Sequence, residues 1–139
     1  MDLERFVRAQ DDGGSYATAL AELRRGRKVS HWMWFVFPQL AGLGRSSTAR
    51  YYALGSLAEA QAYLAHPVLG ARLVETARTV ADLAGLTAEE VFGGIDAVKL
   101  RSSMTLFARA APAEPVFAEV LDHYFDGVPD EVTESLLDG

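Results

Sequence analysis

The sequence predicts a mainly α-helical fold, a single compact domain of about seven to nine short helices in an irregular orthogonal array with little or no sheet. The 139 residues fit one domain of common size, and 50% hydrophobic residues can supply a core. Apolar residues recur at helical spacing, whereas strand-like alternation is nearly absent. Capping residues and glycine or proline breaks divide the chain into short pieces, and no internal repeat or linker is found.

The first two helices are predicted from caps and apolar spacing. Asp2 can cap a helix over 3–10, which places Leu3 and Phe6 on one face. The DDGG sequence at 11–14 is a break. Ser15 can cap the next helix, which ends before Gly26.

The segment SHWMWFVFPQLAGLGRSST at 30–48 is harder to assign, because its short apolar run fits a buried strand or a buried helix. We expect a short helix over 31–37, ended by Pro38. A turn at 42–44 follows, and Ser46 or Ser47 can cap a helical segment that reaches Tyr52.

The second half of the chain has stronger helix signals at its breaks. The expected helices are 57–65 capped by Ser56, 67–84 started by Pro67, 88–92 with a Thr87–Glu90 capping box, 97–110 capped by Asp96, 116–125 started by Pro115, and a short last helix capped by Asp130 and ending near Leu137.

Composition excludes several classes of function. The absence of cysteine removes disulfides, thiolate nucleophiles and cysteine zinc sites. The three histidines lack the spacing of a metal-binding helix, and no nucleotide-cofactor motif is present, so we expect no metal and no cofactor. No apolar run is long enough for a membrane span and no signal peptide is evident, so a cytoplasmic protein is expected. The net charge is −6 and the main basic cluster is 24–28, which makes a nucleic-acid partner unlikely.

The aromatic segment contains candidate site residues beside candidate core residues. Trp32 and Trp34 are the two tryptophans of the chain. One can stack on a base or sugar, and at least one is expected in the core with Phe37. His31 is a candidate general acid or base, with a structural histidine as the alternative. The side-chain amide of Gln39 can form hydrogen bonds with a ligand or with carbonyl groups of its own loop, and the sequence does not favour either role.

The turn GLGRSST at 42–48 is a candidate anion site. Glycines allow close approach of a ligand to the backbone, and the start of the following helix presents free N–H groups. Arg45 can bind phosphate through two hydrogen bonds, and Ser46 adds a hydroxyl. The bland alternative is a helix cap.

A second group of polar residues lies on the helix predicted over 97–110. Lys99 and Ser103 are one turn apart at the edge of the core stripe, with Ser102 beside them. Serines are poor helix formers, so this helix can be presenting hydroxyls and an ammonium to a ligand. The alternative is that the hydroxyls bond back to helix carbonyls and the lysine is solvated.

Two of these segments carry a resemblance to a known family. SHWMWFVFPQLAGLGRSS at 30–47 and DAVKLRSSMTLF at 96–107 resemble the signature of the DUF1810 family, with HPVLGARL at 66–73 and DLERFVRAQ at 2–10 resembling its middle and opening motifs. The resemblance covers nearly the whole chain and implies one mainly helical domain, 1–139, but no activity. Some members carry the label "calpastatin", which nothing in this sequence supports. The arrangement is also similar, without any matched catalytic residue, to the NADAR family, which is linked to ADP-ribose and N-glycosidic chemistry.

Two functions follow as expectations. In the first, the chain binds a phosphate- or ribose-bearing small molecule, and hydrolysis of a glycosidic or phosphoester bond is the candidate reaction. His31 and Lys99 are then the candidate catalytic residues, and the candidate ligand-binding residues are Trp34, Gln39, Arg45, Ser46, Ser102 and Ser103. In the second, the chain is a non-enzymatic interaction domain with a protein partner, and the aromatic segment is core. The sequence leaves the oligomeric state and the substrate open.

Overall fold

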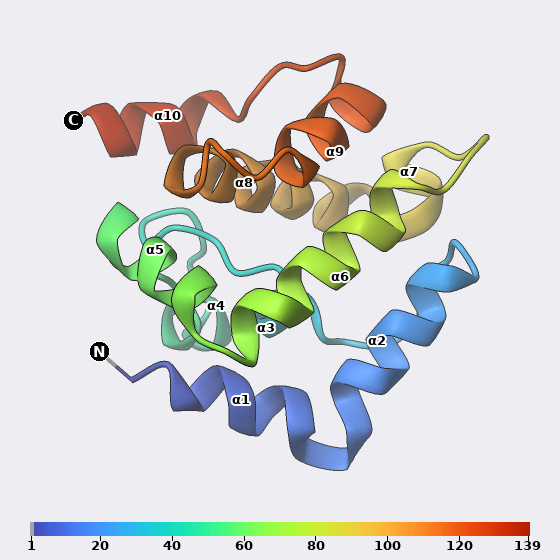
Figure 1. Cartoon of the computed structure of the whole chain (residues 1–139), viewed down its shortest axis with the longest axis horizontal. Coiled ribbons are helices and arrows are strands. Elements are labelled where there is room, and N and C mark those ends of the chain that lie inside the picture. The colour runs from blue at the N-terminus through green and yellow to red at the C-terminus, as the bar shows by residue number, and fades with distance from the viewer. Residues whose placement is uncertain (1) are drawn as a thin grey trace.

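The computed structural model describes residues 2–139, and the fold class predicted from the sequence is confirmed. In chain order the elements are α1 (Glu4–Asp11), a short 3-10 helix (Asp12–Gly14), α2 (Ser15–Arg24), α3 (Met33–Val36), α4 (Ser47–Tyr51), α5 (Leu57–Ala65), α6 (Leu69–Ala81), α7 (Ala88–Phe92), α8 (Gly94–Ala110), α9 (Val116–Phe125) and α10 (Glu131–Asp138). Among the described residues, β-pairing is limited to one isolated parallel bridge between Leu40 and Leu54. The helices cross at varied angles instead of aligning as a bundle (Figure 1).

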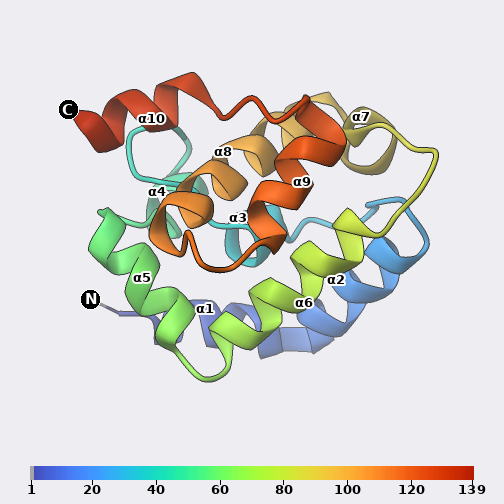
Figure 2. The ribbon, with the colours of Figure 1, turned by 45° about the horizontal axis from the view of Figure 1, so that its top comes forward.

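The longest helix, α8, organises the fold. It has 17 residues and packs against α5, α7, α9 and α10. Helix α6 packs against α2, α5 and α9 on the other side of the core. Helix α10 lies along the outer side of α8, next to the loop between α3 and α4 (Figure 2). The two segments singled out in the sequence are therefore neighbours in space.

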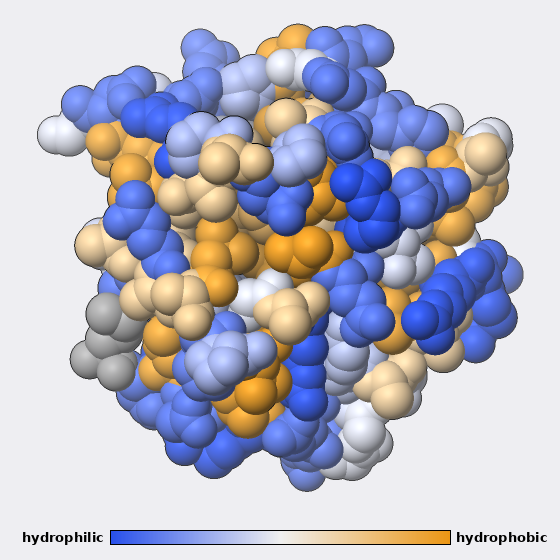
Figure 3. Space-filling view, viewed as in Figure 1, coloured by the Kyte–Doolittle hydropathy of each residue, from blue (hydrophilic) through white to orange (hydrophobic). Residues whose placement is uncertain are grey.

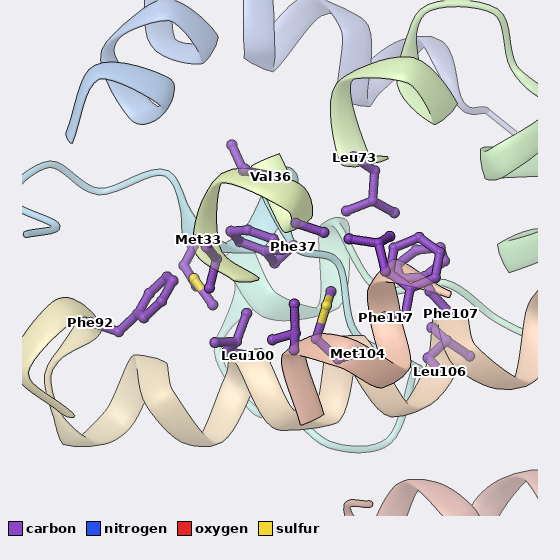
Figure 4. Packing of buried hydrophobic residues seen from close by; sticks show 14 of the residues in the cluster. Met33, Val36, Phe37, Leu73, Phe92, Leu100, Met104, Leu106, Phe107 and Phe117 are labelled. Carbon is purple, nitrogen blue, oxygen red and sulfur yellow. The ribbon is translucent and has the colours of Figure 1, made fainter. Parts of the chain in front are cut away.

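The core forms where α3 meets α8. Phe37 and Met33 face Leu100 and Met104 across this contact, with Phe92 at one end and Phe107 at the other (Figure 4). Trp32, also in this cluster, is 1% exposed. Each large buried apolar side chain contributes about 1.5–3 kcal/mol to folding. The prediction that at least one tryptophan lies in the core with Phe37 agrees with this burial.

Several predicted helix starts differ from the structure. Asp96 does not cap α8, because the helix begins two residues earlier at Gly94 and Gly93 is the capping residue. Helix α6 begins at Leu69 instead of Pro67, and the ring of His66 accepts hydrogen bonds from the backbone N–H groups of Val68 and Leu69. Local cap rules cannot foresee a histidine ring or a glycine pair in this role.

The predicted cap of α7 is present in full. The Thr87 hydroxyl accepts from the Glu90 N–H at 3.1 Å, and the Glu90 carboxylate accepts from the Thr87 N–H at 2.8 Å. We expect Thr87→Ala to lower the free energy of unfolding by about 1 kcal/mol, measured by urea denaturation. Thr87→Ser keeps the hydroxyl, so an equal loss in both variants would contradict the cap.

The surface mixes polar and apolar patches. On the face shown in Figure 3, blue side chains dominate the rim and orange patches are visible near the middle. Across residues 2–139, no helix has the length and apolar character needed to cross a membrane.

Candidate functional site

A buried carboxylate fixes the start of the aromatic segment. Glu22 on α2 is 3% exposed and accepts hydrogen bonds from the backbone N–H groups of Val29 and Ser30, the Ser30 hydroxyl and the Trp32 indole, at 2.6–2.9 Å. Burial opposes ionisation, but these four hydrogen bonds outweigh it and lower the pKa of Glu22 to about 2. The carboxylate therefore holds the indole of Trp32 in the core.

Trp34 has a different environment from Trp32. It is only partly buried, and the ammonium of Lys99 lies 5.1 Å from the centre of one of its rings. This separation is within the range of a cation–π interaction. The two tryptophans thus divide into one core residue and one residue at the edge of a cavity.

Both lysines of the chain lie beside Asp96. The Nζ of Lys28 is 2.9 Å from one oxygen of Asp96, and the Nζ of Lys99 is 3.6 Å from the other. Lys28 also donates to the carbonyl of Ser30 at 2.7 Å and its side chain is only 7% exposed. Lys99 is 24% exposed and has the longer, looser contact. Lys99 therefore keeps more capacity for a further anionic partner than Lys28.

Lys99 lies at the head of a surface groove between α8, the start of α10 and the loop after α3. The groove has a volume of about 410 Å³. Its lining residues are Gln39, Leu43, Gly44, Ile95, Val98, Lys99, Ser102, Asp130 and Val132. A second, small cavity of about 10 Å³ adjoins it and is lined by Met33, Trp34, Phe37, Gln39, Ala49, Tyr52 and Lys99. Gln39 and Lys99 line both, so these two residues separate the closed cavity from the open groove.

The sequence allows two roles for the hydroxyls of α8, contact with a ligand or hydrogen bonding to the carbonyls of their own helix. Ser102 lines the groove and donates to the carbonyl of Val98 at 3.2 Å, and Thr105 donates to the carbonyl of Arg101 at 2.8 Å. Ser103 is fully buried, and its hydroxyl has no hydrogen-bond partner among residues 2–139. Ser102 is therefore the α8 serine that a ligand in the groove can reach.

The remaining predicted site residues lie outside the lining of this groove. His31 and Arg45 are exposed. The hydroxyl of Ser46 caps α4 by accepting from the N–H of Ala49 at 3.1 Å, which agrees with the helix-cap alternative for this turn. The structure thus brings together Trp34, Gln39, Lys99 and Ser102, whereas ligand roles for His31, Arg45, Ser46 and Ser103 stay predictions without a common cavity.

Residues that support the site escaped the sequence reading. The sequence predicts Asp96 as a helix cap and Lys28 as part of the basic cluster 24–28, whereas in the structure Asp96 contacts both Lys28 and Lys99. No sequence pattern marks Glu22 as buried, because a single acidic residue on a helix that also carries arginines is usually predicted to be exposed. One signal was available: the chain has only two lysines, and each lies next to one of the two aromatic or polar motifs.

A surface hollow of about 590 Å³ beside α1 is less suited to an anionic ligand, although Arg5 and Arg8 are among its lining residues. Arg5 is committed there to the carbonyls of Tyr51 and Ala53 at 2.8 and 3.0 Å, and Arg8 to Asp2 at 3.1 Å. Within residues 2–139, no cluster of three or more histidine or acidic side chains could hold a metal ion.

Comparison with known proteins identifies the family. The family model DUF1810, described as a protein of unknown function, matches residues 1–137. The chain belongs to the DUF1810 family. It is also similar to the crystal structure, at 1.38 Å, of the conserved hypothetical protein Rv1873 from Mycobacterium tuberculosis, with 51% sequence identity and a TM-score of 0.96 over 99% of this chain and 97% of that chain. No curated protein matches the chain. Membership in DUF1810 agrees with the helical fold, and because the family is described as being of unknown function, the function has to be argued from the geometry of the site.

Proposed function

We propose that this DUF1810 chain binds a phosphate- or ribose-bearing small molecule in the groove headed by Lys99. The observation that carries the proposal is that Lys99 and Gln39 line both the groove and the small cavity next to Trp34. A few polar groups converging within mostly apolar walls are typical of small-molecule sites.

The head of the groove can hold an anion. The ammonium of Lys99 has one loose carboxylate contact at 3.6 Å, which leaves donor capacity for a phosphate. Gln39 lines the groove beside Lys99, and its side-chain amide offers both a donor and an acceptor. Leu43, Val98 and Val132 supply an apolar wall against which a ring can pack.

Hydrolysis of a glycosidic or phosphoester bond is the reaction class we propose to test at this site. Lys99 could stabilise negative charge that develops on such a bond. The groove lining holds no nucleophile paired with a base, because Ser102 donates to a helix carbonyl and His31 lies outside the lining. Binding is therefore the better supported half of the proposal.

Lys99→Met is expected to abolish the thermal stabilisation that a ligand gives. Wild-type protein should show a saturable rise in melting temperature with AMP or ADP-ribose, since a ligand at about 100 times its Kd stabilises a protein by about 2.7 kcal/mol. The matched control is Arg27→Met, which removes an exposed cation outside the groove. Stabilisation that persists in Lys99→Met, or vanishes equally in Arg27→Met, would overturn the proposed site.

One observation favours the alternative function, a protein-interaction domain. Ile95, Val98 and Val132 line the groove and are 77%, 61% and 56% exposed. Exposed apolar residues grouped in this way are typical of contact surfaces. The same thermal-shift experiment separates the two functions, because a flat response to every nucleotide, together with protein binding that Val98→Asp abolishes, supports the interaction domain.

A further inference from the structure

The charges around the groove head set a limit on the ligand. Lys28 and Lys99 carry two positive charges, and Asp96 between them carries one negative charge. The tight 2.9 Å contact commits Asp96 mainly to Lys28, but its other oxygen still faces Lys99. The three side chains together leave a single uncompensated positive charge, located at Lys99.

A second carboxylate lies on the α10 side of the groove. Asp130 lines the groove, and one of its oxygens accepts from the backbone N–H and hydroxyl of Thr133 at 2.9 and 2.6 Å. Lys99 and Asp130 are the charged residues of the lining. A ligand group near Asp130 must be neutral or a hydrogen-bond donor, because a second negative charge there would face a carboxylate.

We propose that the groove selects a ribose-bearing phosphodiester with one negative charge over the corresponding phosphomonoester with two. This inference rests on the proposed function and adds the charge of the ligand to it. The single charge is placed at Lys99 and Gln39, and the ribose hydroxyls donate toward Asp130. Asp96 and Asp130 are then specificity-determining residues, since each penalises a second negative charge.

The test is a pair of probes that differ by one methyl group. Adenosine 5′-(methyl phosphate) carries one negative charge, whereas AMP at pH 8 carries two because its second phosphate pKa is about 6. In titration calorimetry, wild-type protein is expected to bind the methyl ester about tenfold more tightly than AMP, the effect of one unfavourable charge contact at intermediate dielectric. Asp96→Asn and Asp130→Asn are each expected to reduce this preference severalfold. Asn also serves well as a helix cap, so Asp130→Asn keeps the start of α10.

The control variant is Asp126→Asn, which removes one negative charge outside the groove, as Asp96→Asn and Asp130→Asn do beside it. Asp126 is exposed and has a φ of 54°, a conformation that Asn tolerates. It should leave the preference unchanged. AMP binding as tightly as the ester, in a way that Lys99→Met abolishes, would overturn the charge preference and leave the proposed function standing. Failure of both probes to bind would overturn the proposed function and this inference with it.

Discussion

Replacing Glu22 with Gln is expected to lower the free energy of unfolding by about 3 kcal/mol at neutral pH. Glu22 is nearly inaccessible to solvent and accepts four hydrogen bonds from the segment that begins the aromatic motif. One carboxylate oxygen accepts from the N–H groups of Val29 and Ser30 and from the Trp32 indole, and the other accepts from the Ser30 hydroxyl. A glutamine amide removes the negative charge that strengthens all four hydrogen bonds, and its NH₂ group replaces the oxygen that accepts from the Ser30 hydroxyl.

The same carboxylate should make stability depend on acid pH. Its pKa is lowered from 4.5 to about 2, so the ionised group stabilises the folded state fully above pH 4.5. As pH falls from 4.5 toward 2, about 3 kcal/mol of this stabilisation is lost. Urea denaturation at several pH values measures this loss, and Glu22→Gln should lack that component.

Glu89→Gln is the matched control for this experiment. Glu89 is an exposed acid on α7, and such surface changes usually alter stability by less than about 0.5 kcal/mol. A Glu22→Gln variant as stable as Glu89→Gln, with the wild-type acid profile, would show that the carboxylate does not hold the motif.

Gly70→Ala is expected to cost about 3 kcal/mol or more, because it fills a close crossing between α5 and α6. A Cβ atom at Gly70 would lie 2.0 Å from the carbonyl oxygen of Leu64 and 2.9 Å from its carbonyl carbon. These are backbone atoms, so relief requires the two helices to separate. Thermal and urea unfolding measure the loss.

Gly94→Ala provides the comparison. Gly94 is the first residue of α8, and a Cβ there would meet no atom within 4 Å. Alanine should leave stability unchanged or raise it by about 0.5 kcal/mol. Equal effects at Gly70 and Gly94 would contradict the close crossing.

Much of the fold could be predicted from sequence because its signals are local. The 57–65, 88–92 and 116–125 helices match α5, α7 and α9, since their caps or prolines act within one turn. Helix α3 was ambiguous because its apolar run is compatible with strand or helix. The start of α6 depends on the ring of His66, which is also paired with Glu4, far away in sequence.

The candidate site was only half accessible from sequence. Lys99, Trp34, Gln39 and Ser102 were chosen from residue type, and they line two adjoining cavities. The roles of Glu22 and Asp96 depend on contacts across helices, so no spacing rule reveals them. Asp130 was recognised as a cap, and its place in the groove became visible only when α10 was positioned against α8.

The binding of a ligand at the head of the groove is tested most directly by the indole signals of the two tryptophans. Trp34 lies beside Lys99 at the cavity, whereas the Trp32 indole is held by Glu22 in the core. Titration of ¹⁵N-labelled protein with adenosine 5′-(methyl phosphate) should shift the Trp34 indole signal saturably, leave the Trp32 signal in place, and have no effect in Lys99→Met. An unmoved Trp34 signal at saturating probe, or an equal shift in Lys99→Met, would contradict a ligand site at this groove.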